Sequence, residues 1–158
     1  RHMEFSKENF EYLDPETNER YIPYCVEPSV GLDRLLLMTL VDSYEEEELE
    51  NDTRIVLRLA PHIAPYQVAV LPLQKKLSEK AHAVFKEVVK EFSAVYDETA
   101  SIGKRYRRQD AIGTPYCVTI DFDTLDDESV TIRERDSMAQ VRIKISELNS
   151  YIRSKVYK

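Results

Sequence analysis

The chain has 158 residues with 42% hydrophobic and 32% charged side chains, which is typical of one or two small globular domains. It contains no apolar run of about 18 residues, so we expect no transmembrane helix. The net charge of −7 argues against a protein that coats nucleic acid indiscriminately.

The charge is unevenly distributed along the chain. Residues 1–62 hold 6 Lys/Arg and 15 Asp/Glu, a net charge of −9, whereas residues 63–158 hold 16 and 14, a net charge of +2. The second part is therefore nearly neutral with a local basic cluster, a pattern that suits selective contact with RNA. The start Arg1-His2-Met3 is typical of a tag remnant, and we exclude residues 1–3 from the folding argument.

The first part predicts a turn, a strand and a buried helix. Asn9–Glu19 contains turn residues, and Tyr21–Val26 is a predicted strand. Residues 31–44 are apolar on nearly all faces, which predicts a helix of the kind that is normally buried in a larger protein; in this chain we expect it to expose apolar surface or to hide it in an oligomer. Glu45–Asp52 is interpreted as a solvated acidic segment, and the prolines of residues 60–65 predict a linker with a domain boundary near residue 63.

The second part alternates between strands and helices. Strands are predicted at residues 67–71, 94–96 and 116–122, and helices at 75–92 and 101–112. Residues 130–133 and 141–145 flank a turn at Asp136-Ser137, which predicts an antiparallel hairpin. Ser146 is a candidate cap for a last helix. The expected fold is α/β, a mixed sheet of about five strands with about three helices.

Two segments carry candidate chemistry. Glu27, Ser29 and Arg34 lie at a predicted strand-to-helix junction, where a helix N-terminus favours anionic groups. The alternative is that Ser29 caps the helix and Arg34 pairs with Asp33 or the acidic run. The second segment is Ile102–Asp123, with the sequence IGKRYRRQDAIGTPYCVTIDFD.

The second segment predicts an RNA contact. Helical spacing places Lys104, Arg105 and Arg108 on one face, interleaved with Tyr106, and cations combined with an aromatic ring suit unpaired RNA bases. Arg107 points elsewhere and is interpreted as structural. The alternative is a solvated helix that pairs with Asp110 or Glu98.

The end of the third predicted strand provides two more candidates. Thr119 is a candidate for reading a base edge and Phe122 for stacking on a base, because ligands of open α/β sheets collect near strand ends. The carboxylates that follow at residues 121–128 lack the glycine and terminal glutamate of a calcium loop, which favours a solvated turn over a metal site. Cys25 and Cys117, placed in predicted strands, are expected to be reduced and packed, and no metal is expected.

Both segments, together with Arg133–Ile143, resemble class II aminoacyl-tRNA synthetases of the glycyl-tRNA synthetase family. The resemblance runs from about Phe10 to the C-terminus and lacks everything N-terminal to this part of the family pattern, so we expect a C-terminal fragment. It implies a piece of catalytic domain with the third class II motif at residues 4–62 and an anticodon-binding domain at residues 63–158. Ala111 departs from the family, where a glutamate is common.

The resemblance also implies roles. Glu27 and Ser29 would contact glycine, Arg34 would pack on the adenine of ATP, and Lys104, Arg105, Arg108, Thr119 and Phe122 would contact the anticodon of tRNA(Gly). The full-length enzyme would be a cytoplasmic homodimer that uses ATP and Mg; the groups that activate ATP belong to motifs outside this sequence, so the fragment is expected to be inactive alone. Alternatives are a non-catalytic synthetase-like accessory protein and a flavodoxin-like nucleotide binder, which would need a Gly-rich loop that this chain lacks.

Overall fold

The computed structural model describes residues 1–49 and 52–157 and divides the chain into two compact units, Arg1–Arg34 and Leu35–Lys158. The first unit contains α1 (His2–Ser6) and a small antiparallel pair, β1 (Tyr12–Leu13) and β2 (Arg20–Tyr21). Asp14 Oδ1 accepts hydrogen bonds from the backbone of Glu16 and Thr17 and closes the turn that the sequence predicts.

The predicted strand Tyr21–Val26 is wrong beyond its first residue. Strand β2 ends at Tyr21 because β1 offers only two pairing residues, and Pro23 has no backbone N–H to continue a ladder. Residues 22–31 are exposed and have neither helical nor strand structure. Cys25 is therefore exposed instead of packed in a strand.

Helix α2 (Leu32–Ser43) confirms the predicted apolar helix, and none of its residues is buried. The acidic segment that follows is largely exposed, as predicted, but it forms a strand that the sequence did not predict; Glu50 and Asn51 lie outside the described residues. Strand β3 (Tyr44–Leu49) pairs antiparallel with β4 (Asp52–Leu57), and the register sets Glu47 opposite Arg54. Arg54 on β4 and Arg58 just after it thus compensate the glutamates of β3.

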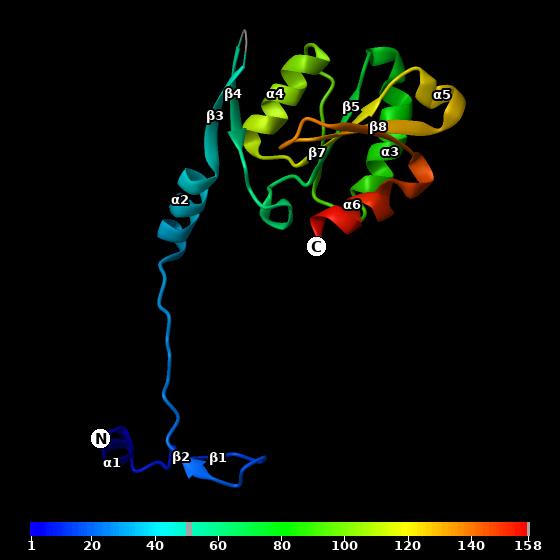
Figure 1. Cartoon of the computed structure of the whole chain (residues 1–158). Helices are drawn as coiled ribbons and strands as arrows, with labels where there is room; N and C mark the ends of the chain where they lie inside the picture. The colour runs from blue at the N-terminus through cyan, green and yellow to red at the C-terminus, as the bar shows by residue number, and fades with distance from the viewer. Residues whose placement is uncertain (50–51, 158) are drawn as a thin grey trace. The chain divides into compact units, whose positions relative to one another are not determined.

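The second unit is built on a five-stranded sheet (Figure 1), which confirms the predicted fold class. Its order is β6 (Ala94–Tyr96), β5 (Val68–Pro72), β7 (Tyr116–Ile120), β8 (Ser129–Glu134), β9 (Gln140–Lys144). The first two pairings are parallel, and β7–β8 and β8–β9 are antiparallel. The sheet is therefore mixed, with the predicted hairpin at its β9 edge.

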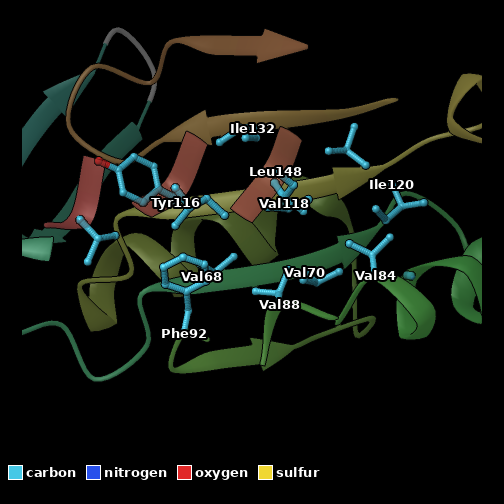
Figure 2. Packing of buried hydrophobic residues seen from close by; sticks show 14 of the residues in the cluster. Val68, Val70, Val84, Val88, Phe92, Tyr116, Val118, Ile120, Ile132 and Leu148 are labelled. Carbon is cyan, nitrogen blue, oxygen red and sulfur yellow. The ribbon is translucent and has the colours of Figure 1, made fainter. Parts of the chain in front are cut away.

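Three helices cover the sheet. Helices α3 (Ser78–Val88) and α6 (Leu148–Val156) pack on one face, where the main core lies (Figure 2), and α4 (Ile102–Ile112) packs on the other against Ala69, Leu71 and Cys117. Alternation along β5 and β7 explains this two-sided burial, since successive side chains point to opposite faces. In the described part of the chain, no helix combines the length and apolarity needed to cross a bilayer.

Short elements complete the unit: η1 (Pro61–Ile63), η2 (Lys75–Leu77), α5 (Asp123–Asp127) and η3 (Ile145–Glu147). Helix α5 was not predicted, because a five-residue acidic helix carries no apolar period. Ser146 lies inside η3 and does not cap α6; Glu147 occupies the N-cap position without a side-chain hydrogen bond.

Candidate nucleic-acid interface

The predicted basic face of α4 is only partly exposed. Lys104 and Arg108 are exposed, but Arg105 is buried with 3% of its surface accessible, so the prediction that the three cations share one face is wrong. The Arg105 guanidinium donates to the backbone carbonyls of Pro72, Asp97 and Ala100, at the ends of β5 and β6 and before α4. Position 105 faces the sheet because it lies on the same side of α4 as Ile102, Tyr106 and Gln109, which are turned toward the interior.

The remaining cations of α4 differ in their partners. Arg108 pairs with Asp97 at 2.6 Å and also donates to the Thr99 carbonyl at 2.9 Å. Arg107, interpreted as structural, pairs with Asp52 of β4 at 2.9 Å. Lys104 makes no ion pair with any residue that the structure describes.

Thr119 and Phe122 also differ in their surroundings. The Thr119 hydroxyl lies 2.6 Å from the Tyr106 hydroxyl, and Thr119 is buried, with 6% of its surface accessible. Phe122 follows β7 at the N-cap of α5, and 44% of its surface is exposed. The Phe122 ring is thus accessible to a ligand, whereas Thr119 is buried next to Tyr106.

Next to Thr119 the sheet carries polar side chains on the face of α4. The pairing register aligns Thr119 on β7, Thr131 on β8 and Arg142 on β9, which we call the polar row. Sequence reasoning missed Thr131 and Arg142, although the alternation that predicted the hairpin also places them on the polar face. Only the pairing of β8 with β7 shows that they continue from Thr119.

Arg142 is held between two carboxylates. It donates to Asp121 at 2.6 Å and to Asp127 at 3.3 Å, and the Lys144 ammonium donates to the Asp127 carbonyl at 2.5 Å. Asp127 also accepts hydrogen bonds from the hydroxyl and backbone N–H of Ser129. Together with the contact from Arg142, these hydrogen bonds lower the pKa of Asp127 to about 2. Hydrogen bonds from Arg142 and Thr124 likewise lower the pKa of Asp121.

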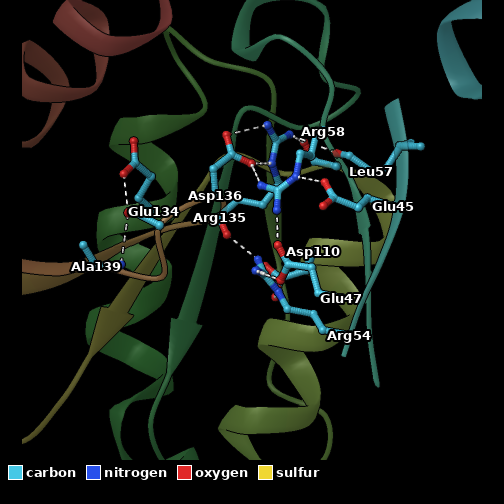
Figure 3. A network of polar contacts seen from close by, with 12 residues as sticks. Glu45, Glu47, Arg54, Leu57, Arg58, Asp110, Glu134, Arg135, Asp136 and Ala139 are labelled. Atoms are coloured by element: carbon cyan, nitrogen blue, oxygen red, sulfur yellow. Dashed lines mark hydrogen bonds and ion pairs between the residues drawn. The ribbon is translucent and has the colours of Figure 1, made fainter. Parts of the chain in front are cut away.

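A second feature missed in the sequence is a buried polar network between β4, α4 and β8 (Figure 3). Asp110 is fully buried and accepts from Arg54 Nε at 2.9 Å and from both terminal nitrogens of Arg133 at 2.8 and 3.0 Å. Burial opposes the Arg54 charge, but hydrogen bonds and attraction to Asp110 and Glu47 outweigh it and raise the pKa of Arg54. The network attaches the β3–β4 hairpin to the sheet.

The two cysteines lie in different surroundings, with Cys25 exposed and Cys117 buried. Burial raises the pKa of the Cys117 thiol to about 12, so it is inert at neutral pH. In the ranges 1–49 and 52–157, no group of three His, Cys, Asp or Glu side chains is arranged to hold a metal ion.

The residues predicted to bind glycine and ATP lie in the first unit. Glu27, Ser29 and Arg34 are all exposed, and Arg34 makes no ion pair with Asp33 among the described residues. A pocket of about 440 Å³ in this unit is formed by other residues: Arg1, His2, Met3, Phe10, Ile22, Pro23 and Cys25. The three predicted residues are therefore not enclosed in a shared cavity here.

The mixed sheet with its polar face is the fold of a known family of domains. The family of anticodon binding domains matches residues 67–155, and this chain belongs to that family. In solved structures, the RNA binding domain of threonyl-tRNA synthetase from Cryptosporidium parvum superposes with a TM-score of 0.59 at 26% identity, covering 64% of this chain and 26% of that one. Histidyl-tRNA synthetase from Nostoc superposes with a TM-score of 0.55 at 23% identity, covering 57% and 22%, which shows the fold alone.

The particular relatives are glycine–tRNA ligases, which confirms the resemblance found in the sequence. The enzyme of Bacillus anthracis is 61% identical over 156 residues, and that of Clostridium acetobutylicum is 62% identical over 157 residues. Each alignment covers 99% of this chain and 34% of the relative, so the chain spans about a third of the length of these curated relatives.

Proposed function

We propose that this chain recognises the anticodon of tRNA(Gly) as part of a glycine–tRNA ligase. The observation that supports this most directly is the 61% identity with glycine–tRNA ligases over 99% of the chain, combined with the family match at residues 67–155. The parent enzyme would join glycine to tRNA(Gly) with ATP and Mg, in the cytoplasm and as a homodimer.

The proposed RNA surface is the polar row with its neighbours. Phe122 offers an exposed ring for stacking, Arg142 can exchange a carboxylate for an RNA phosphate, and Lys104 adds an exposed cation on α4. Arg108 can act in the same way as Arg142. Arg105 is no longer part of the proposed surface, because its guanidinium is buried on backbone carbonyls.

Binding of matched and anticodon-swapped tRNA tests the proposal. Filter binding with the 158-residue chain is expected to favour glycine tRNA over the same tRNA with an unrelated anticodon. A well-formed base-edge contact contributes about 1–3 kcal/mol of discrimination. Equal affinity for the two transcripts at every salt concentration would rule out anticodon reading by this chain.

We further propose that residues 4–62 belong to the catalytic domain of the parent, residues 63–158 to the anticodon-binding domain, and residues 1–3 to a tag. Glu27 and Ser29 would then contact glycine and Arg34 the adenine of ATP. Adenylate formation needs preorganised cations around the α-phosphate, and the exposure of all three side chains supports the proposal that this chain alone is inactive. Glycine-dependent exchange of pyrophosphate into ATP by the purified chain would refute it.

A further inference from the structure

A continuous series of contacts leads from the β3–β4 hairpin to the polar row. Its first half is the buried network, in which Arg54 of β4 and Arg133 of β8 both donate to Asp110 of α4. All three residues have at most 5% of their surface exposed. The hairpin precedes the residues 67–155 that match the anticodon-binding family, so this contact brings an additional segment against that domain.

The second half runs from Arg133 to the polar row. The guanidinium carbon of Arg133 lies 4.9 Å from the centroid of the Tyr106 ring, within the range of a cation–π contact. The Tyr106 hydroxyl lies 2.6 Å from Thr119 Oγ1, and Thr119 pairs in register with Thr131, whose hydroxyl is 3.3 Å from Arg142. From Arg54 to Arg142, each member therefore contacts the next through its side chain or pairs with it across the sheet.

The buried carboxylate fixes this arrangement. The bidentate pair of hydrogen bonds to the Asp110 carboxylate sets both the position and the plane of the Arg133 guanidinium. Without Asp110, Arg133 would lose its only carboxylate partner among the described residues, and a buried guanidinium must then find other acceptors or reach water. Either movement would take it off the Tyr106 ring and so remove one of the contacts that hold the tyrosine beside Thr119.

We propose that Asp110 is a positioning residue for anticodon recognition: through Arg133 and Tyr106 it holds the Thr119 hydroxyl and the adjoining polar row in place, and Arg54 ties this arrangement to the β3–β4 hairpin. This inference rests on the proposed function, because it assumes that the polar row contacts RNA. The proposal assigns a function to the buried side chains of Arg54, Asp110 and Arg133, which do not themselves contact RNA.

Selectivity for the anticodon is the quantity to measure. The ratio of the Kd for anticodon-swapped tRNA to the Kd for matched tRNA is determined for the 158-residue chain, for Tyr106→Phe, for Asp110→Asn and for the double variant. Tyr106→Phe removes one hydroxyl and keeps the ring, and Tyr151→Phe on α6, at the other face of the sheet, is the matched control. Urea unfolding of each variant establishes the fraction folded under the binding conditions.

Each single variant is expected to lower the ratio about threefold to tenfold, the change that corresponds to one lost hydrogen bond. The double variant is expected to equal the more affected single one, because both act on the same contact, and Tyr151→Phe is expected to keep the ratio. If Asp110→Asn does not fold, Arg54→Met replaces it in the same comparison of two single variants with their double variant.

Three results separate the proposals. A ratio of one for the unmodified chain would contradict the proposed function itself. A normal ratio in the unmodified chain together with unchanged ratios in the folded variants would overturn the positioning role alone. Effects that multiply in the double variant would also overturn it, because independent sites multiply, whereas members of one series of contacts do not.

Discussion

Arg54 Nε donates a 2.9 Å hydrogen bond to Asp110 Oδ2, and both side chains are completely buried although 56 residues separate them in the sequence. This contact and the two from Arg133 make Asp110 the centre of the polar interior between β4, α4 and β8. Its partners are cations that cannot deprotonate, so the effect of losing the carboxylate is predictable.

Replacing Asp110 by Ala is expected to destabilise the protein by about 3–5 kcal/mol, since Arg54 and Arg133 would stay buried without their shared partner. Urea unfolding followed by circular dichroism measures the change. Asp126→Ala, which removes an exposed carboxylate of α5, is the matched control and is expected to change the free energy of unfolding by less than about 0.5 kcal/mol. Similar results for the two variants would contradict the view of Asp110 as a buried anchor.

Arg105→Ala is expected to affect stability and not RNA contact. Its guanidinium donates to the carbonyls of Pro72, Asp97 and Ala100, and leaving the buried Pro72 carbonyl without this partner costs about 1–3 kcal/mol. At a temperature where the variant is still folded, its tRNA affinity and salt dependence should match those of the unmodified chain. A weaker salt dependence in the fully folded variant would place Arg105 at the RNA after all.

The two glycines of the α4 region are expected to respond in opposite directions. Gly113 ends the helix with φ +86°, and a Cβ there would lie 3.0 Å from the Leu57 carbonyl and from Leu59, so Gly113→Ala should destabilise by at least about 1–2 kcal/mol. Gly103 is the second residue of the helix with open space around it, and Gly103→Ala should stabilise by roughly 0.4–1 kcal/mol. Thermal unfolding of both variants would show the opposite signs; a stabilising Gly113→Ala would refute the steric argument.

Acid stability is expected to depend on Asp127. Its pKa falls from the ordinary 3.8 to about 2 in the folded state, because of hydrogen bonds from Ser129 and Arg142. A lowered pKa stabilises the folded state above the ordinary value, and the contribution disappears as the pH falls from about 4 to about 2. In urea unfolding at several pH values, Asp127→Asn should reduce the loss of stability across this window, whereas Asp126→Asn should not.

Arg142→Ala is expected to weaken tRNA binding and to lower the salt dependence of log K by about 0.7, the value for one phosphate contact to a single strand. The control is Arg153→Ala on α6, since Arg153 is also an exposed arginine held in an ion pair, with Glu91. Filter binding at several salt concentrations compares the two. Equal slopes in the two variants would remove Arg142 from the RNA surface.

Much of the second unit could be predicted because its elements have simple periods. Residues 67–71 form an apolar run, residues 130–133 and 141–145 alternate, and the helix near residue 102 ends at Gly113 in the left-handed region. These are local signals, set by backbone geometry and by the side of each element that is buried. The acidic strand β3 was missed because its glutamates pair with Arg54 on β4 and with Arg58 just after it, and reading each segment separately does not reveal these pairs.

The site was less predictable than the fold. Phe122 and Lys104 are exposed as expected, but Arg105 and Thr119 are buried, and Arg142 was not considered. Helical spacing alone cannot tell a solvent-facing cation from one that reaches carbonyls at the end of a neighbouring strand.

The sequence by itself determined the class of fold, the order of most elements and the resemblance to glycyl-tRNA synthetases, because periodicity and motifs are properties of neighbouring residues. Only the tertiary structure decided which cations face water and which ones are buried around a shared carboxylate. A charged side chain is stable in the interior only when acceptors from other elements surround it, as Asp110, Arg54 and Arg133 show, and those acceptors come together only when distant segments of the chain pack.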